Sequence, residues 1–220
     1  IFVNKDGDFV LAIGRDEKLE NLIVIQSLNK KETHKIKVSK RQYRVQKIDG
    51  LPKNKVTPSE EEMKRIKKES KKIKKSKNLF LNKTLYKSGF IWPVKGIVTG
   101  EYGNQRILNG KPRRPHYGLD IAAKSGSKII SPSDAIVVLT MEDSFFNGKM
   151  IILNHGLGIN SIYSHLKKIY IKEGEKIKKG DLIAEVGSTG RSTGPHLDWR
   201  INVFNTAVDP ALLLSNQPKF

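Results

Sequence analysis

The feature that most constrains this chain is a series of short, glycine-punctuated segments that begins near Phe90 and continues toward the C-terminus. Hydrophobic and polar residues alternate in these segments with a period of two, and no long amphipathic helical pattern interrupts them. The clearest are GFIWPVKGIVTGEYG, KIISPSDAIVVLT, GKMIILNHG, INSIYSHL and KEGEKIKKGDLIAEVGSTG. Short strands at close spacing predict an antiparallel sheet folded over on itself. We therefore expect a mainly β protein.

The N-terminal part of the chain has a similar pattern. The stretches DFVLAIGR, NLIVIQSL and HKIKVSKRQYRVQKI combine β-branched residues with period-two alternation and charged turns. We expect residues 1–52 to form a small, sandwich-like β-module that is separate from the region 90–220.

Residues 53–89 change pattern and predict a basic helical linker. Thr57, Pro58 and Glu60 have the spacing of a capping box with proline at the first helical position, so a helix is expected near residues 58–77. The apolar residues of this helix form only a narrow stripe: Met63, Ile66 and Ile73. Most of the helix would therefore be solvated. It is interpreted either as a spacer lying along the next domain or as an electrostatic tether to an anionic envelope surface.

The composition narrows the classes of function. The 220 residues include no cysteine, which excludes disulfides, thiolate metal sites and a cysteine nucleophile. The formal net charge of +19 favours anionic partners, although a lysine-rich, solvated surface explains the same charge more simply. Aromatic residues make up 7% and no nucleic-acid-binding motif is present, so we expect no nucleic-acid partner.

The ends of the chain and its hydropathy bear on location. No apolar run approaches the roughly 18 residues of a membrane span, so we expect no transmembrane segment. The chain begins at Ile1 with neither an initiator methionine nor a signal-peptide pattern. We therefore expect a processed or trimmed chain.

Three of the five histidines lie near acidic, aromatic or glycine residues: His116 in RRPHYGLD, His165 in SIYSHL and His196 in GPHLDW. His34 lies on a charged strand and is expected at the surface. His155 lies in a turn and is expected to be structural.

The spacing of carboxylates around these histidines suggests a metal site. Asp120 follows His116 by four residues, and Asp198 follows His196 by two. Side chains two apart on a strand point to the same face, so His196 and Asp198 should project side by side. Imidazole and carboxylate together suit zinc, and catalytic zinc usually has three protein ligands and one open position. His116, Asp120 and Asp198 are therefore candidate ligands. His165 and His196 then remain free to move protons.

In that order, RRPHYGLDIAA, SIYSHL and GSTGRSTGPHLDW resemble the motifs of the lysostaphin/LytM-type zinc metallopeptidases, which cut peptide bridges in peptidoglycan. The resemblance covers roughly residues 90–212 and implies an antiparallel sheet with an open groove. It implies that His116 and Asp120 bind Zn²⁺, and that His165 and His196 orient or deprotonate the attacking water and stabilise the oxyanion.

The same resemblance implies a place of action and a substrate. It predicts that Tyr163 and Arg106 line the groove and that peptidoglycan cross-links are hydrolysed. It also predicts a periplasmic or cell-envelope location, reached with a leader that this chain lacks.

Asp198 stands where the family pattern has histidine. That histidine is understood to bind through Nδ1, and a carboxylate oxygen is equally far from Cβ in bonds, so Asp198 has nearly the right reach. A His-Asp-Asp ligand set would neutralise the charge of the Zn²⁺ dication, whereas a His-His-Asp set leaves one positive charge. Water bound at the His-Asp-Asp site should therefore be less acidic. We expect a working but retuned zinc endopeptidase.

The alternative is a catalytically degenerate domain that binds peptidoglycan or activates another murein hydrolase. Arg200 lies two residues after Asp198 on the same strand face and could hold its carboxylate in a salt bridge instead of a metal. Arg113 and Arg114 flank His116 and could do the same.

Overall fold

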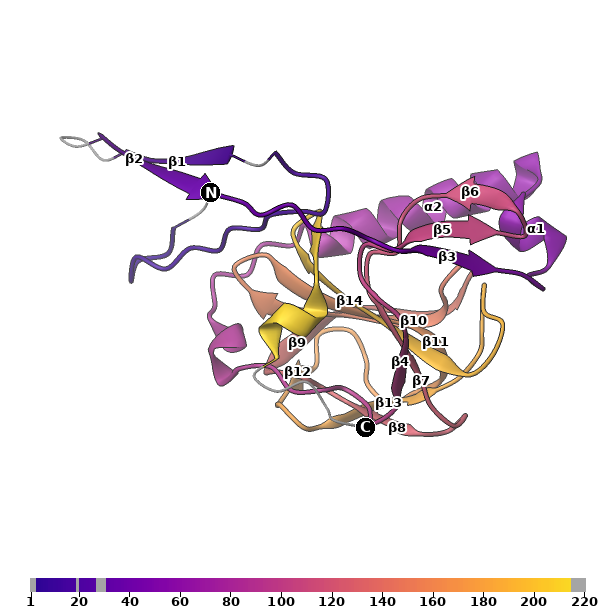
Figure 1. Cartoon of the computed structure of the whole chain (residues 1–220). Helices are drawn as coiled ribbons and strands as arrows, with labels where there is room; N and C mark the ends of the chain where they lie inside the picture. The colour runs from indigo at the N-terminus through magenta and orange to yellow at the C-terminus, as the bar shows by residue number, and fades with distance from the viewer. Residues whose placement is uncertain (1–2, 19, 27–30, 215–220) are drawn as a thin grey trace.

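The largest feature of the computed structural model is a ten-stranded sheet, here called the main sheet (Figure 1). The structure describes residues 3–18, 20–26 and 31–214. The strand order is β12-β9-β10-β11-β14-β7-β4, with β13 paired to β11 and β8, and β15 paired to β14. Every strand pair in it is antiparallel. The strands are β4 (Ile97–Gly100), β7 (Leu119–Ala122), β8 (Lys128–Ile130), β9 (Ala135–Ser144), β10 (Gly148–Gly156), β11 (Ile159–Ile169), β12 (Lys176–Ile177), β13 (Leu182–Val186), β14 (His196–Val203) and β15 (Thr206–Val208). The predicted mainly β, antiparallel fold is confirmed.

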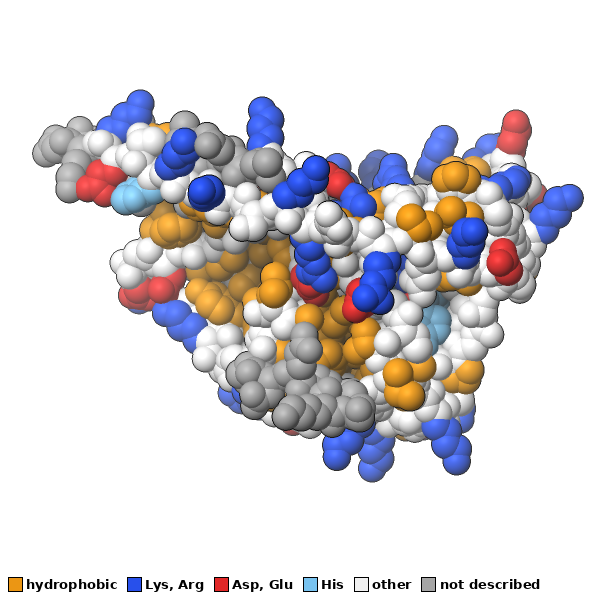
Figure 2. Space-filling view, in the orientation of Figure 1, with side chains coloured by type: hydrophobic (Ala, Val, Ile, Leu, Met, Phe, Trp, Pro, Cys, Tyr) orange, Lys and Arg blue, Asp and Glu red, His pale blue; other side chains and the backbone are white. Residues whose placement is uncertain are grey.

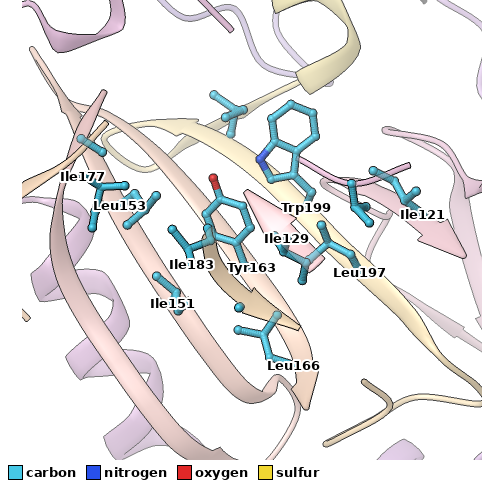
Figure 3. Close-up of a cluster of buried hydrophobic side chains, with 14 of the residues drawn as sticks. Ile121, Ile129, Ile151, Leu153, Tyr163, Leu166, Ile177, Ile183, Leu197 and Trp199 are labelled. Carbon is cyan, nitrogen blue, oxygen red and sulfur yellow. The ribbon is translucent and has the colours of Figure 1, made fainter. Parts of the chain in front are cut away.

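The principal core lies where alternate side chains of these strands meet (Figure 3). Leu197 and Trp199 of β14 are fully buried in it. Because alternate residues of a strand point to opposite faces, His196, Asp198 and Arg200 lie on the other face of β14. Burial of the hydrophobic face thus decides which face of β14 carries the polar residues.

The helix α2 (Glu60–Lys77) lies along β9 and β10. Its Ile73 packs against a small buried cluster of the main sheet, made by Leu139, Met150, Ile152 and Ile162. Ile66 is buried as well, whereas Met63 is exposed. The helix predicted near residues 58–77 is therefore confirmed, and it occupies the position expected of a spacer along the next domain.

The predicted start of this helix is wrong. Its N-cap is Ser59, whose Oγ accepts a hydrogen bond from the Glu62 N–H, while the Glu62 carboxylate accepts one from the Ser59 N–H. Thr57 instead ends the short helix α1 (Lys53–Val56). Two overlapping Ser/Thr-x-x-Glu patterns occur here, and the preceding turn of α1 leaves only the second free to cap α2.

The N-terminal region differs from the sandwich-like module expected for residues 1–52. Within the described residues, β1 (Glu20–Gln26) and β2 (Lys31–Lys37) form a two-stranded antiparallel sheet. The next strand, β3 (Val45–Ile48), pairs in parallel with β5 (Gln105–Leu108), which pairs with β6 (Lys111–Arg113). Period-two alternation identified strand-forming segments, but it could not identify the partner of β3 across more than fifty residues of sequence.

Basic side chains are spread over the molecule. Figure 2 shows Lys and Arg around the whole outline of the visible face, with fewer acidic residues between them.

The remaining helical turns are the 3₁₀ segments η1 (Leu85–Ser88) and η2 (Pro210–Leu213). Among the described helices, none is both long and apolar enough to cross a membrane.

The capping interaction predicts a difference between two neighbouring hydroxyls. Ser59→Ala removes the acceptor of the Glu62 N–H and should lower the free energy of unfolding by about 1 kcal/mol. Thr57→Ala is the matched control, because Thr57 caps no N-terminus and only accepts a hydrogen bond from exposed Lys111. Urea unfolding of both variants is the measurement. Equal losses would contradict the assignment of Ser59 as the cap.

A second prediction concerns His155, which is fully buried at the end of β10. Its Nδ1 donates to the Asp134 carbonyl at 2.7 Å, and its Nε2 accepts from Ser161 Oγ at 2.6 Å. Burial lowers the pKa of His155 to about 4. The unfolded chain binds this proton near pH 6.5, so the stability due to neutral His155 is complete above that pH and is lost as the pH falls toward 4.

The measurement is the free energy of unfolding between pH 7 and pH 4. His155→Gln keeps a donor and an acceptor but cannot titrate. As the pH falls from 7 to 4, the free energy of unfolding should decrease less in this variant than in the wild type. The difference between the two decreases should be on the order of 3 kcal/mol. Parallel curves for the two proteins would rule out His155 as a source of acid sensitivity.

Candidate metal centre

Three of the predicted site residues come together on the polar face of the main sheet. His116, Asp120 and Asp198 each offer a ligand atom, and these atoms lie within 4.8 Å of one another. Asp120 on β7 is directly opposite Asp198 on the antiparallel strand β14. His116 lies in the segment before β7 and is held by its backbone, since its N–H donates to the Asn104 carbonyl at 2.8 Å. All three ligand candidates are buried.

Two further histidines lie beside this group. The rings of His165 and His196 have centroids 4.7 Å apart. His196 Nε2 is 3.9 Å from Asp120 Oδ1. The structure therefore brings all five predicted metal and catalytic residues into one site.

His165 reaches the site through an irregularity of β11. Ile151 and Lys149 of β10 oppose Tyr163 and Leu166 of β11, so β11 contains one extra residue between these two pairs. This is the arrangement of a β-bulge, and His165 within it has a φ of 66°, which is uncommon for a residue other than glycine. Such backbone strain persists only where the surrounding structure enforces it, and it often re-aims a functional side chain.

Tyr163 does not line a groove, because its register partner on β14 is the core residue Trp199. Tyr163 is 0% exposed and packs in the principal core (Figure 3), where its hydroxyl hydrogen-bonds Ser161 Oγ at 2.9 Å. The prediction for Tyr163 is wrong. Simple alternation would place Tyr163 and His165 on one face, but the inserted residue separates them.

Each imidazole beside the ligand group is held through Nδ1. His165 Nδ1 donates to the Thr189 carbonyl at 2.7 Å, and His196 Nδ1 donates to the Gly194 carbonyl at 2.9 Å. A carbonyl can only accept, so the neutral rings carry their proton on Nδ1 and leave Nε2 unprotonated. Burial lowers the pKa of His165 to about 4, so this ring is neutral near pH 7.

Two arginines bind the two carboxylates. Arg106 Nη2 donates to Asp120 Oδ2 at 2.6 Å, and Arg200 donates to both oxygens of Asp198. Burial raises the pKa of Asp120, but interactions with His116 and Arg106 outweigh it and lower the pKa to about 2. Burial also opposes ionisation of Asp198, yet Arg200 holds its pKa well below the usual range. Both carboxylates are therefore ionised and able to act as ligands.

Of the arginines proposed from sequence as partners of the metal-site carboxylates, Arg200 makes the contact. Arg113 instead donates to the Val56 carbonyl at 2.8 Å. The contact of Arg106 with Asp120 was not predicted. These residues lie fourteen positions apart on β5 and β7, and no local spacing links them.

Two glycines leave space for the ion pairs. A Cβ on Gly118 would lie 2.5 Å from Arg200 Cγ and 2.8 Å from Asp198 Oδ1. A Cβ on Gly100 would lie 2.4 Å from Asp120 Oδ2. A Cβ on Gly118 would also lie 2.7 Å from the Trp199 carbonyl oxygen, so close approach of both backbone and side chains explains glycine at these positions. The φ of Gly118 lies outside the left-handed region, so a sharp backbone bend is not the reason.

The residues of this site fit a divalent metal. His116 Nε2 is buried and has no hydrogen-bond partner among the described residues, although Asp120 Oδ1 lies 3.1 Å away. A buried nitrogen without a partner is unfavourable unless something else satisfies it. One imidazole nitrogen and two carboxylate oxygens form a donor set that zinc accepts.

A cavity of about 560 Å³ adjoins the site. Arg200 lines it together with Arg114, Tyr117 and Asn147. The N-terminal segment 14–17 also lines this cavity, so part of its wall comes from outside the main sheet.

Comparison with known proteins agrees with this geometry. The model of peptidase family M23 matches residues 114–210, which contain all five histidine and aspartate residues of the site. An uncharacterised metalloprotease of Haemophilus influenzae is 38% identical over 97 residues, which are 44% of this chain and 20% of that protein. Peptidoglycan DD-endopeptidase ShyB of Vibrio cholerae is 37% identical over 122 residues, 56% of this chain and 26% of that protein. The chain thus matches less than a third of the length of either relative.

Solved structures extend the likeness to the fold. A Pseudomonas aeruginosa protein assigned to peptidase M23 superposes with a TM-score of 0.76 at 27% identity, covering 96% of this chain and 82% of that one. A zinc-containing peptidase from Vibrio cholerae superposes with a TM-score of 0.53 at 31% identity, covering 59% of this chain and 41% of that one. The family match and the superpositions agree with the fold, and residues 114–210 of the chain therefore belong to a domain of peptidase family M23 of the lysostaphin/LytM type.

Proposed function

We propose that this chain is a zinc-dependent endopeptidase of the cell envelope that hydrolyses peptide cross-links of peptidoglycan. The observation that carries the proposal is the grouping of His116, Asp120 and Asp198, with ligand atoms within 4.8 Å of one another, beside two held imidazoles. The peptidoglycan DD-endopeptidases among its relatives support the choice of substrate.

The three buried residues would hold the metal. When bound, Zn²⁺ supplies a Lewis acid for the scissile carbonyl and lowers the pKa of a water molecule. Arg106 and Arg200 hold the carboxylates of Asp120 and Asp198 in a fixed orientation, which limits the reorganisation needed when substrate arrives.

The two imidazoles handle protons. In the tautomer whose Nδ1 donates to a backbone carbonyl, His165 and His196 each leave Nε2 able to accept a proton from the attacking water. Once protonated, either ring can donate to the carbonyl oxygen as it gains charge, or to the leaving amine. The positively charged side chain of Arg114, which lines the adjoining cavity, suits the carboxylates of peptidoglycan peptides.

The location and the anionic partner belong to the same proposal. Peptidoglycan lies in the envelope, so this chain would act there. The exposed lysines of α2 would then face anionic polymers or headgroups while its apolar residues stay packed against the main sheet.

One contact favours a second candidate function. Arg200 donates to both oxygens of Asp198, which is the arrangement expected if a salt bridge replaced a metal ligand. In that case the domain would bind peptidoglycan, or activate another hydrolase, without cutting it.

Digestion of purified sacculi separates the two functions. With zinc supplied, the wild type should release muropeptides with cleaved cross-links, and a chelator should stop the release. Mass spectrometry of the soluble fraction is the measurement. Retention on sacculi without cleavage, at saturating zinc, would favour the binder.

Single substitutions separate the roles of the neighbouring residues Asp198 and His196. Asp198→Ala removes a ligand and should weaken zinc binding by more than about 100-fold, because even groups that only orient ligands account for 10–100-fold. His196→Ala should retain zinc and lose turnover, since its Nε2 meets substrate and water instead of the metal.

Metal content after dialysis against trace zinc, measured together with sacculus digestion, tests this assignment. Asp181→Ala, at an exposed aspartate of the turn before β13, is the control and should change neither quantity. If the wild type and Asp198→Ala hold the same negligible zinc, Asp198 is not a ligand.

A further inference from the structure

The contact between Arg200 and Asp198 is a close, two-oxygen ion pair. Arg200 Nε lies 2.9 Å from Asp198 Oδ1 and 3.2 Å from Oδ2, and Nη2 lies 2.5 Å from Oδ2. The residues are two apart on β14 and share its polar face. Hydrogen bonds between a guanidinium and a carboxylate are among the strongest in proteins, and their planar geometry fixes the orientation of both groups.

Asp120 has a comparable partner in Arg106. The Arg106 guanidinium binds Oδ2 of Asp120, which leaves Oδ1 facing His116 at 3.1 Å and His196 at 3.9 Å. One arginine therefore stands behind each carboxylate of the candidate metal centre.

These pairs change the charge expected from the sequence. Two carboxylates alone would cancel the charge of a dication, but here each is already balanced by a guanidinium. The ligand group and its two arginines therefore carry no net charge when the histidines are neutral. The sequence predicted that a second carboxylate would make the metal centre less positive than a His-His-Asp site. Because Arg200 balances the charge of Asp198, this difference in charge is not expected.

The absence of a side chain at Gly118 leaves room for the ion pair of Asp198 and Arg200. A Cβ on Gly118 would collide with Arg200 Cγ and Asp198 Oδ1 together. The same Cβ would lie 2.7 Å from the Trp199 carbonyl oxygen, so Gly118 leaves room for the backbone of β14 as well as for the ion pair.

We propose that Asp198 and Arg200 act as one unit in place of the histidine of the family pattern, with Arg200 as a positioning residue that makes Asp198 a neutral, oriented ligand. The inference rests on the proposed metal site. Each carboxylate oxygen has two lone pairs, and Asp198 Oδ1 accepts a single hydrogen bond from Arg200, so Oδ1 retains a lone pair for a metal.

The proposal predicts that the effect of removing Arg200 depends on residue 198. Asp198→His restores the ligand of the family pattern but leaves the Arg200 charge without its partner beside a dication. This variant should bind zinc at least tenfold more weakly than the wild type. Adding Arg200→Gln should recover at least tenfold.

In the wild-type background, Arg200→Gln has two opposed effects. It frees Asp198 to rotate, which weakens binding, and it exposes a negative charge, which strengthens it. We therefore expect a change well below tenfold, so that the double-mutant cycle shows a coupling of tenfold or more.

The measurement is zinc affinity of the whole chain, by competition with a chromophoric chelator at fixed pH and ionic strength. Circular dichroism checks the fold of each variant. If Asp198→His does not fold, Asp198→Asn leaves Arg200 unpaired at nearly unchanged volume and serves in the same cycle. Arg41→Gln is the control, because Arg41 pairs with the buried carboxylate of Asp209 in another ion pair and should not alter zinc affinity.

The outcomes distinguish this inference from the proposed function. A wild type that binds no zinc overturns the metal site and the ion-pair unit together. If the wild type binds zinc and Arg200→Gln raises zinc affinity equally in the wild-type and Asp198→His backgrounds, the metal site stands but the Asp198–Arg200 unit does not. Arg200 would then be only a nearby positive charge that repels the metal. If Asp198→His binds zinc as tightly as the wild type does, the proposed Asp198–Arg200 unit is overturned as well.

Discussion

The site depends on two buried carboxylates that face each other across neighbouring strands. The register of β7 and β14 places Asp120 directly opposite Asp198, where like charges are destabilising and where burial adds a desolvation penalty. Arg106 and Arg200 offset both effects, and His116 Nε2 lies 3.1 Å from the other oxygen of Asp120, Oδ1. Gly100 and Gly118 leave room for these ion pairs, because a Cβ at either position would collide with them. A bound dication would be a further source of compensation.

The core keeps that register in place. Leu197 and Trp199 alternate with the polar residues of β14, so a slip by one residue would bury Asp198 in the hydrophobic face and expose Trp199. The bulge in β11 adds His165 to the polar face while Tyr163 remains in the core. Rigid packing on one side of the sheet therefore positions the chemistry on the other. This arrangement suits a reaction that needs preorganised dipoles and proton acceptors.

Much of the architecture could be predicted from local patterns. Alternation predicted the strands after Phe90, and the spacing of carboxylates around the histidines predicted a metal site of His116, Asp120 and Asp198, three residues that do meet in the structure. Local patterns were less informative where two capping motifs overlap, or where the pairing partner of a strand lies far away in the sequence. The capping box moved from Thr57 to Ser59 because α1 precedes it, and β3 found its partner in β5, far along the chain.

The sequence by itself determined the elements whose cause lies within a few residues: the strands, the approximate position of α2, and the pair formed by Asp198 and Arg200 two positions apart. Only the tertiary structure decided that Tyr163 is core, that His165 turns to the opposite face, and that Arg106 holds Asp120. The reason is physical. A bulge is defined by the register between two strands, and an ion pair between β5 and β7 depends on how those strands pack, so neither leaves a signal in any single stretch of the chain.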